Sequence, residues 1–225
     1  MSDRKALLQR KLSEVSAKLR PGVELVIVSK TRPVEDVLMY YELGHRDFGE
    51  NRVQELYEKS ELLKKKCPKI RWHMIGHLQS NKINQLFTIE NLVSIHSVHS
   101  EELLEKLLKA EHRLSHEVGI YLQYNTSHED EKSGFETYHE LEAAAEMALR
   151  GRNLSLVGVM TMGTLRTEDF EAEAGRCFQD LVVEKNKLEA ELGVKLKTSM
   201  GMSRDYEIAL REGTDCLRLG TMMFV

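Results

Sequence analysis

Short apolar runs alternate with stretches of helical period along the whole chain. The first run, "VELVIVS", holds four consecutive apolar residues and is typical of a strand buried on both faces of a parallel sheet. Between such runs, apolar residues recur every three or four positions, which predicts amphipathic helices. Strands are predicted at residues 23–29, 46–50, 70–76, 92–98, 118–125, 154–162, 195–200 and 216–221.

Eight strands that alternate with helices favour an α/β fold, a single (β/α)₈ barrel of the TIM type. Leu8, Leu12, Val15 and Leu19 lie at helical spacing and predict an extra helix before the first strand. A doubly wound open sheet is the alternative, because one miscounted strand would change the topology. No linker rich in Pro, Gly or Ser divides the chain, so residues 1–225 are expected to form one domain.

Composition and charge narrow the class of protein. Net charge is −4 and no dense Lys/Arg stripe is present, which argues against a nucleic-acid partner. The N-terminal segment is too polar for a signal peptide or a membrane span. Three widely spaced cysteines without a CxxC motif indicate a reducing compartment and no metal site. We therefore expect a cytoplasmic protein that binds no membrane, and a monomer because no apolar helix is left unpartnered.

In barrels of this type the working groups follow the C-terminal ends of the strands. The first strand is followed there by Lys30 and the second by Asn51. A lysine next to a buried strand is expected to be partly desolvated, which lowers its pKa and leaves a neutral amine. Lys30 is thus a candidate to form a Schiff base with a carbonyl ligand.

The loops after the last two strands have the composition of a phosphate site. In "TSMGMS" (198–203), the hydroxyls of Ser199 and Ser203 and nearby backbone N–H groups precede a helix expected to start near Arg204. In "RLGT", Gly220 permits close approach of the backbone and Thr221 adds a hydroxyl. Barrels commonly hold a phosphate at these two loops. Neither GxxxxGK[ST] nor GxGxxG occurs, which argues against the usual nucleotide motifs.

A Schiff-base lysine opposite a phosphate site leaves two ligands open. One is pyridoxal 5′-phosphate (PLP), an aldehyde that carries its own phosphate. The other is a phosphosugar, as in lysine-dependent aldolases.

A series of motifs resembles the pyridoxal phosphate homeostasis protein family, whose barrel is similar to that of bacterial alanine racemases. The motifs span nearly the whole chain in order. They are "VSKT" (28–31), "FGENRVQE" (48–55), "WHMIGHLQSNK" (72–82), "LQYNTSHEDEKSGF" (122–135), "LVGVMTMG" (156–163) and "SMGMSRDYEIALREGTDCLRLGT" (199–221).

The resemblance implies a role for each residue of the site. It implies that Lys30 holds PLP as a Schiff base, that Asn51 lies near the cofactor ring, and that Arg218 faces the pyridine nitrogen. The phosphate would be held by the remaining site residues, Ser199, Ser203, Gly220 and Thr221.

Arg218 also bears on whether the protein is an enzyme. Arginine does not give up its proton, so it would leave the pyridine nitrogen unprotonated and the ring a poor electron sink. Racemases with this arginine add an acid/base group from a further C-terminal domain, and no such segment follows Val225 in this sequence. The expectation is a PLP-binding protein of intracellular PLP homeostasis without robust turnover, which passes PLP transiently to apo-enzymes.

Two alternatives remain open. A PLP-dependent amino-acid racemase would use Tyr206 or His73 as its second base. A PLP-independent aldolase would use Lys30 alone. The acidic loop 127–134 is expected at the barrel rim and receives no assigned role.

Overall fold

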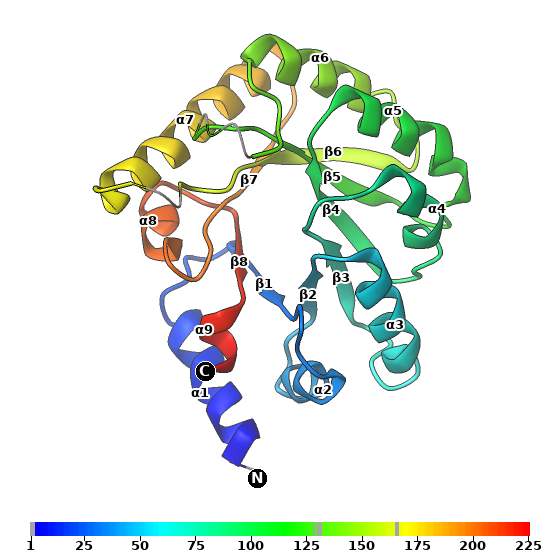
Figure 1. Ribbon diagram of the computed structural model, residues 1–225, viewed down its shortest axis with the longest axis vertical. Helices are drawn as coiled ribbons and strands as arrows, with labels where there is room; N and C mark the ends of the chain where they lie inside the picture. The colour runs from blue at the N-terminus through cyan, green and yellow to red at the C-terminus, as the bar shows by residue number, and fades with distance from the viewer. Residues whose placement is uncertain (1–2, 128, 130–131, 165–166) are drawn as a thin grey trace.

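Eight parallel strands form a closed barrel in the computed structural model, which describes residues 3–127, 129, 132–164 and 167–225 (Figure 1). Each strand pairs with its neighbours in chain order, and β1 pairs with β8 to close the barrel. The strands are β1 (Glu24–Val28), β2 (Asp47–Glu50), β3 (Arg71–Met74), β4 (Leu92–Val98), β5 (Val118–Gln123), β6 (Leu154–Met160), β7 (Lys197–Ser199) and β8 (Cys216–Leu219). The predicted barrel is confirmed, and the open-sheet alternative is wrong because β1 and β8 are hydrogen-bonded neighbours.

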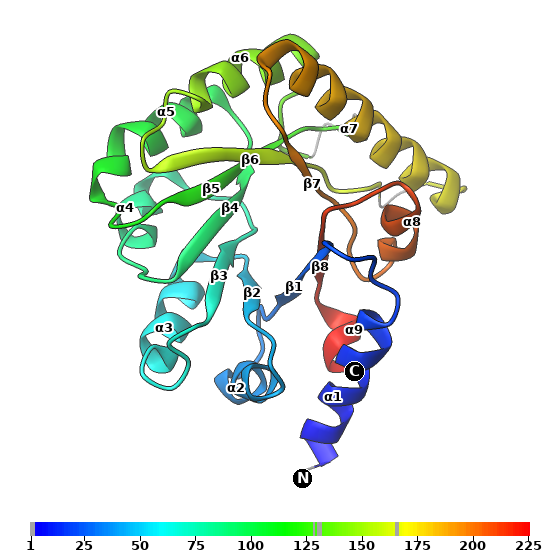
Figure 2. The same cartoon turned by 180° about the vertical axis from the view of Figure 1, so that it is seen from behind.

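Helices surround the barrel on the outside, as the two opposite views in Figures 1 and 2 show. The longer ones are α1 (Asp3–Ser16), α2 (Val34–Glu42), α3 (Val53–Leu63), α5 (Glu101–Ala110), α6 (Tyr138–Ala148) and α7 (Phe170–Leu192). The short ones are η1 (Ser80–Lys82), α4 (Ile83–Leu86), η2 (Glu111–Arg113), α8 (Tyr206–Arg211) and α9 (Thr221–Phe224). The expected N-terminal helix is α1, which lies beside α9, where Arg4 donates a hydrogen bond of 2.7 Å to the carbonyl oxygen of Phe224.

Local signals start two of these helices. Ser100 accepts a hydrogen bond from the backbone N–H of Leu103 at the start of α5. Thr137 and Glu140 form a reciprocal capping box at the start of α6. Each arrangement satisfies backbone donors that the first helical turn leaves unpaired.

The apolar core lies between the strands and the surrounding helices. Phe48 of β2 and Trp72 of β3 are fully buried, with ring centroids 6.0 Å apart. Leu56 of α3 and Leu104 of α5 are also fully buried in this layer. Burial of each such side chain contributes roughly 1.5–3 kcal/mol, so this layer holds the barrel rigid around the site at its mouth.

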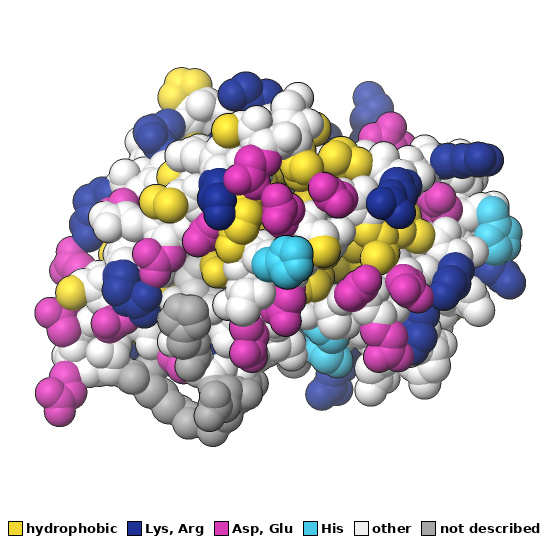
Figure 3. Space-filling model, turned by 90° about the horizontal axis from the view of Figure 1, so that it is seen from above, with side chains coloured by type: hydrophobic (Ala, Val, Ile, Leu, Met, Phe, Trp, Pro, Cys, Tyr) yellow, Lys and Arg dark blue, Asp and Glu magenta, His cyan; other side chains and the backbone are white. Residues whose placement is uncertain are grey.

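One face of the molecule carries mixed charge. Figure 3 views the molecule from above Figure 1 and shows acidic and basic side chains interspersed, with hydrophobic side chains between them. Within the part of the chain that the structure describes, no helix is both long enough and apolar enough to cross a membrane.

Candidate functional site

A cavity of about 280 Å³ opens where the strands end at their carboxyl side. The residues that line it come from the ends of six strands and the loops that follow. They are Val28, Lys30, Asn51, Ile75, Met160, Met162, Phe170, Met202, Ser203, Arg204, Asp205, Arg218, Gly220 and Thr221. Six of the seven residues singled out from the sequence therefore meet in one cavity.

Ser199 is the one that does not line the cavity. It is the last residue of β7 and is fully buried. Its hydroxyl accepts a hydrogen bond from Arg218 and lies 2.8 Å from Nδ1 of His96. Ser199 therefore contacts Arg218, which lines the cavity, from inside the barrel.

Lys30 sits in a tight turn just beyond β1. The N–H of Arg32 donates to the carbonyl oxygen of Ser29 at 3.0 Å, which closes the turn around Lys30 and Thr31. Thr31 has φ of 60°, a left-handed conformation that is strained for a β-branched residue. Lys30 is exposed, so the expected partial desolvation of its amine is not found. The reason is its position, two residues past the end of the buried strand.

A cluster of charged side chains, Lys59, Glu50 and Glu55, packs against this turn. Nζ of Lys59 lies 2.7 Å from the carbonyl oxygen of Ser29, 2.7 Å from Oε1 of Glu50 and 2.9 Å from Oε1 of Glu55. The same Glu55 oxygen accepts the N–H of Thr31 at 2.7 Å. The Lys59 ammonium thus contacts Ser29 directly and Thr31 through Glu55, and these are the two residues that flank Lys30. Burial raises the pKa of Glu50, and the nearby Lys59 ammonium opposes that rise.

Close backbone contact positions Asn51. A Cβ atom on Gly76 would lie 2.3 Å from the carbonyl oxygen of Asn51, so only glycine fits at position 76. The loop after β3 therefore packs directly on the loop after β2. This contact holds Asn51 at the edge of the cavity.

Arg218 is a buried cation whose contacts are neutral. Its guanidinium donates to the Ser199 hydroxyl and, at 2.9 Å, to the carbonyl oxygen of Thr161. Only 4% of the residue is exposed. Burial lowers the pKa of Arg218, against the opposing influence of Cys216 and Asp205.

The loop between β7 and α8 depends on Gly201. Its φ is +99°, and a Cβ atom there would lie 2.6 Å from Cβ of Ala209 and from Cδ2 of Leu217. The helix after the loop starts at Tyr206, two residues later than expected. Asp205 accepts the N–H of Met202 at 2.5 Å, so that N–H is already occupied.

Met160 and Met162 were noted in the sequence as side chains close to the cofactor, whereas Asp205 and Phe170 were missed. Burial raises the pKa of Asp205, although its hydrogen bond from Met202 and the charge of Arg218 act in the opposite direction. Phe170 opens α7 and carries the guanidinium of Arg204 over its ring at 4.7 Å. No motif marks Phe170, whereas Asp205 directly follows the serine-rich loop and could have been noted.

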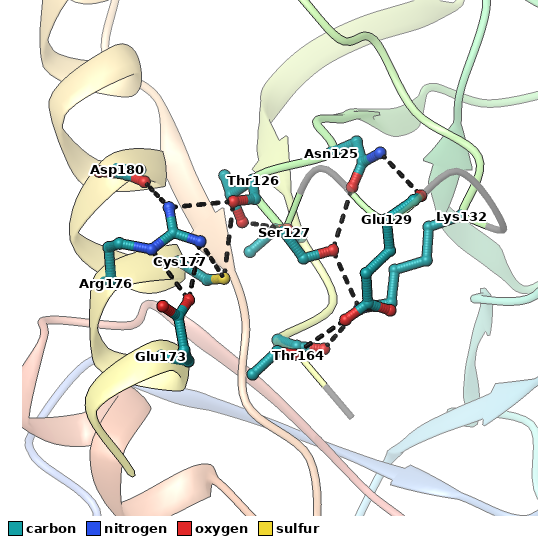
Figure 4. A network of polar contacts seen from close by, with 12 residues as sticks. Asn125, Thr126, Ser127, Glu129, Lys132, Thr164, Glu173, Arg176, Cys177 and Asp180 are labelled. Carbon is teal, nitrogen blue, oxygen red and sulfur yellow. Dashed lines mark hydrogen bonds and ion pairs between the residues drawn. The ribbon is translucent and has the colours of Figure 1, made fainter. Parts of the chain in front are cut away.

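The described part of the acidic loop lies against the chain after β6 (Figure 4). Thr164 donates to Glu129 at 2.8 Å, and Lys132 donates to the carbonyl oxygen of Gly163 at 3.0 Å. Because Met162 of the same segment lines the cavity, these contacts connect the loop to the cavity wall. Residues 128, 130 and 131 of the expected loop lie outside the described residues.

Sequence comparison assigns the chain to a family. The family model described as "Alanine racemase, N-terminal domain" matches residues 4–225. The pyridoxal phosphate homeostasis protein of Schizosaccharomyces pombe is 36% identical over 203 residues, which are 90% of this chain and 84% of that protein. This chain belongs to the pyridoxal phosphate homeostasis protein family.

Solved structures agree with the family and the fold. PipY of Synechococcus elongatus PCC7942, solved with PLP bound, is 30% identical, with a TM-score of 0.86 over 97% of this chain and 100% of PipY. The alanine racemase of Clostridium difficile 630 is 12% identical, with a TM-score of 0.74 over 97% of this chain and 56% of the racemase. The racemase match shows the fold alone, and it confirms that the family's barrel is like that of the racemases.

Proposed function

We propose that this protein binds PLP in the cavity at the barrel mouth and serves intracellular PLP homeostasis. The observation that carries the proposal is that the amine of Lys30 shares one cavity with buried Arg218 and the loops of Ser203 and Thr221. An amine suits the aldehyde of PLP, and cations with hydroxyls suit its phosphate. The family of the chain and the PLP-bound structure of PipY support the same ligand.

The chemical character of the cavity fits PLP. Six apolar side chains line it, which suits a flat aromatic ring better than a phosphosugar; they are Val28, Ile75, Met160, Met162, Phe170 and Met202. Among the described residues, its charged lining residues are three cations and one acid, Lys30, Arg204, Arg218 and Asp205. This excess of positive charge favours an anionic ligand.

Each residue then has a role in the proposal. Lys30 would hold PLP through its amine, Ser203, Gly220 and Thr221 would hold its phosphate, and Asn51 would face its ring. Arg218 would donate toward the ring nitrogen, and Ser199 acts through Arg218. When bound, PLP would supply its aldehyde to the Lys30 amine.

We also propose that robust turnover is absent and that PLP passes on to apo-enzymes. Of the two residues considered as a racemase base, Tyr206 is hydrogen-bonded to Lys18 at 2.9 Å on the surface. His73 is bound to Ser94 and Asp47 inside the barrel. Neither lines the cavity, and an arginine at the ring nitrogen disfavours carbanion chemistry. The racemase alternative is therefore the less favoured.

The proposed setting is a cytoplasmic monomer without a nucleic-acid or membrane partner. Cys67, Cys177 and Cys216 are free and buried, as suits a reducing compartment. The interspersed charges in Figure 3 offer no single-sign patch on that face for a nucleic acid.

Absorption spectroscopy tests the cofactor. Wild-type protein, Lys30→Ala and the control Lys65→Ala are mixed with PLP, reduced with borohydride and mapped by peptide mass. We expect a near-visible band and a pyridoxyl group on Lys30 in the wild type and the control, and neither in Lys30→Ala. A colourless wild type in the presence of PLP would exclude the proposal and favour the aldolase.

A further inference from the structure

A continuous chain of hydrogen-bonded side chains runs through the inside of the barrel. Its members, in order, are Arg218, Ser199, His96, Ser94, His73 and Asp47. After the contact of Arg218 with Ser199, the heavy-atom distances are 2.8, 2.7, 2.7 and 3.0 Å. Barrel interiors are usually filled by branched apolar side chains, so a polar chain here calls for an explanation.

The chain spans the barrel from one end to the other. Ser199 is the last residue of β7, whereas Asp47 is the first residue of β2. Arg218 lines the cavity at the carboxyl ends of the strands, whereas Asp47 lies at the amino-terminal start of β2, so the chain runs from the cavity toward the other end of the barrel. At that other end, Asp47 meets Arg71 at 3.0 Å.

With both histidine rings neutral, the carboxylate end sets the direction of the hydrogen bonds along the chain. Arginine can only donate, and an ionised carboxylate can only accept. Burial opposes the charge of Asp47, but the hydrogen bond from His73 and the charge of Arg71 outweigh it, so the pKa of Asp47 is lowered. Asp47 therefore stays an acceptor at neutral pH.

The carboxylate of Asp47 determines which ring nitrogen of His73 and of His96 carries the proton. A neutral His73 that donates its Nε2 proton to Asp47 accepts from Ser94 at Nδ1, so Ser94 accepts from Nε2 of His96, and Nδ1 of His96 is left to accept from Ser199. Burial and the nearby Arg218 and His73 lower the pKa of His96, which leaves a neutral ring with its proton on Nε2, donated to Ser94. Ser94 donates in turn to Nδ1 of His73, whose Nε2 proton goes to Asp47.

We propose that this interior chain is a positioning device for Arg218 that makes Asp47, at the far end of the barrel, a determinant of the cofactor environment. It orients a group rather than conducting protons, because arginine does not release the proton that a relay would have to move. A buried cation such as Arg218, whose hydrogen-bond partners among the described residues are neutral, benefits from acceptors whose orientation cannot reverse. The role toward the ligand rests on the proposed PLP function, whereas the oriented chain rests on the hydrogen-bond geometry and on the charge states of Asp47 and His96.

The first test needs no PLP. Long-range ¹H–¹⁵N NMR of the histidine rings in the unloaded protein is expected to show protons on Nε2 of both His73 and His96. Ser94→Ala should abolish the single tautomer of His96, and Ser94→Thr, which keeps the hydroxyl, should restore it. The matched control is Ser97→Ala on the same strand, whose hydroxyl bonds instead to the carbonyl oxygen of Gly76. A proton on Nδ1 of either ring in the wild type would overturn the proposal.

The second test loads the same variants with PLP. Loss of one orienting hydrogen bond should weaken PLP binding about five-fold and shift the absorption band in Ser94→Ala and Asp47→Asn. Ser97→Ala should match the wild type. A wild-type spectrum and affinity in folded Ser94→Ala would overturn the positioning role. If the unloaded protein shows the expected tautomers but never binds PLP, the cofactor proposal fails while the oriented chain stands.

Discussion

Nζ of Lys59 lies 2.7 Å from Oε1 of Glu50, and both side chains are buried beneath the turn that carries Lys30. The other carboxylate oxygen of Glu50, Oε2, is buried without a hydrogen-bond partner among the described residues. The ammonium of Lys59 is therefore the main compensation for a buried acid. It also holds the carbonyl oxygen of Ser29, next to Lys30 in the chain.

Lys59→Met is expected to destabilise the protein strongly. It leaves Glu50 buried and without its cation, which costs about 3–5 kcal/mol in comparable pairs. Urea denaturation measures the loss. Lys59→Met/Glu50→Gln should recover part of this loss, because the uncompensated charge is gone. Lys64→Met, which removes an exposed ion pair at the C-terminal end of the same helix, should leave the midpoint unchanged. A loss in Lys59→Met no larger than in Lys64→Met would contradict the role given to the cluster.

Gly201→Ala should damage the loop between β7 and α8. The positive φ costs alanine about 1–2 kcal/mol, and contacts of 2.6 Å with Ala209 and Leu217 add to that cost. We expect lower stability together with weaker PLP binding, measured by denaturation and by titration of the absorption band. The control is Gly193→Ala, at a helix end with φ of +67° and no atom near the added Cβ. It should lose only the backbone contribution and bind PLP normally, and equal effects in the two variants would argue against the predicted contacts.

Asp205 should make PLP binding depend on pH. Burial raises the pKa of Asp205, and an anion in the same cavity would raise it further. Binding should then take up a proton, so affinity increases as pH falls toward that raised pKa. Asp205→Asn should bind PLP more tightly than the wild type at neutral pH and lose this part of the pH dependence. Titration of both proteins with PLP between about pH 5.5 and 8 tests this prediction. Parallel curves of PLP affinity against pH would show that the protonation of Asp205 does not change when PLP binds.

The barrel could be predicted from the sequence because its signals are local. Strands such as β1, with four consecutive apolar residues, are short apolar runs, and strand 92–98 is read directly from "LVSIHSV". The directions in which side chains point at the ends of the strands were harder to predict from the sequence. Ser199 was expected to hold phosphate with Ser203, yet it points into the barrel, whereas Ser203 lies in the loop and lines the cavity.

The chain of hydrogen bonds inside the barrel could not be predicted from the sequence, for a different reason. Ser94 and His96 alternate within β4 and so share one face, which the sequence does show. Their partners come from β3 and β7, and the distance from Ser94 to His73 depends on a register shift between β3 and β4. Such pairings are set by strand register around the closed barrel, which one sequence does not specify.

His96 should make the stability of the protein depend on pH. Burial lowers the pKa of His96 well below its usual 6.5, whereas in the unfolded chain it titrates normally. Below about pH 6.5 the unfolded state thus binds the extra proton, and stability must fall as pH falls, by at most about 1.4 kcal/mol per pH unit from this residue. Above pH 6.5 both states hold a neutral ring, and the contribution is constant.

A comparison of slopes isolates this contribution. Urea denaturation of the wild type and His96→Gln at pH 5, 6, 7 and 8 gives the free energy of unfolding against pH. His96→Gln should be less stable at every pH, since it interrupts the interior chain, but its decline below pH 6.5 should be shallower. His45, whose pKa burial also lowers, remains in both proteins and cancels in the difference. Equal slopes in the two proteins would mean that His96 accepts a proton in the folded state. A charged His96 has no free lone pair on Nδ1 and could not accept the hydroxyl proton of Ser199. The proposed direction of the hydrogen bonds that hold Arg218 would then be wrong as well.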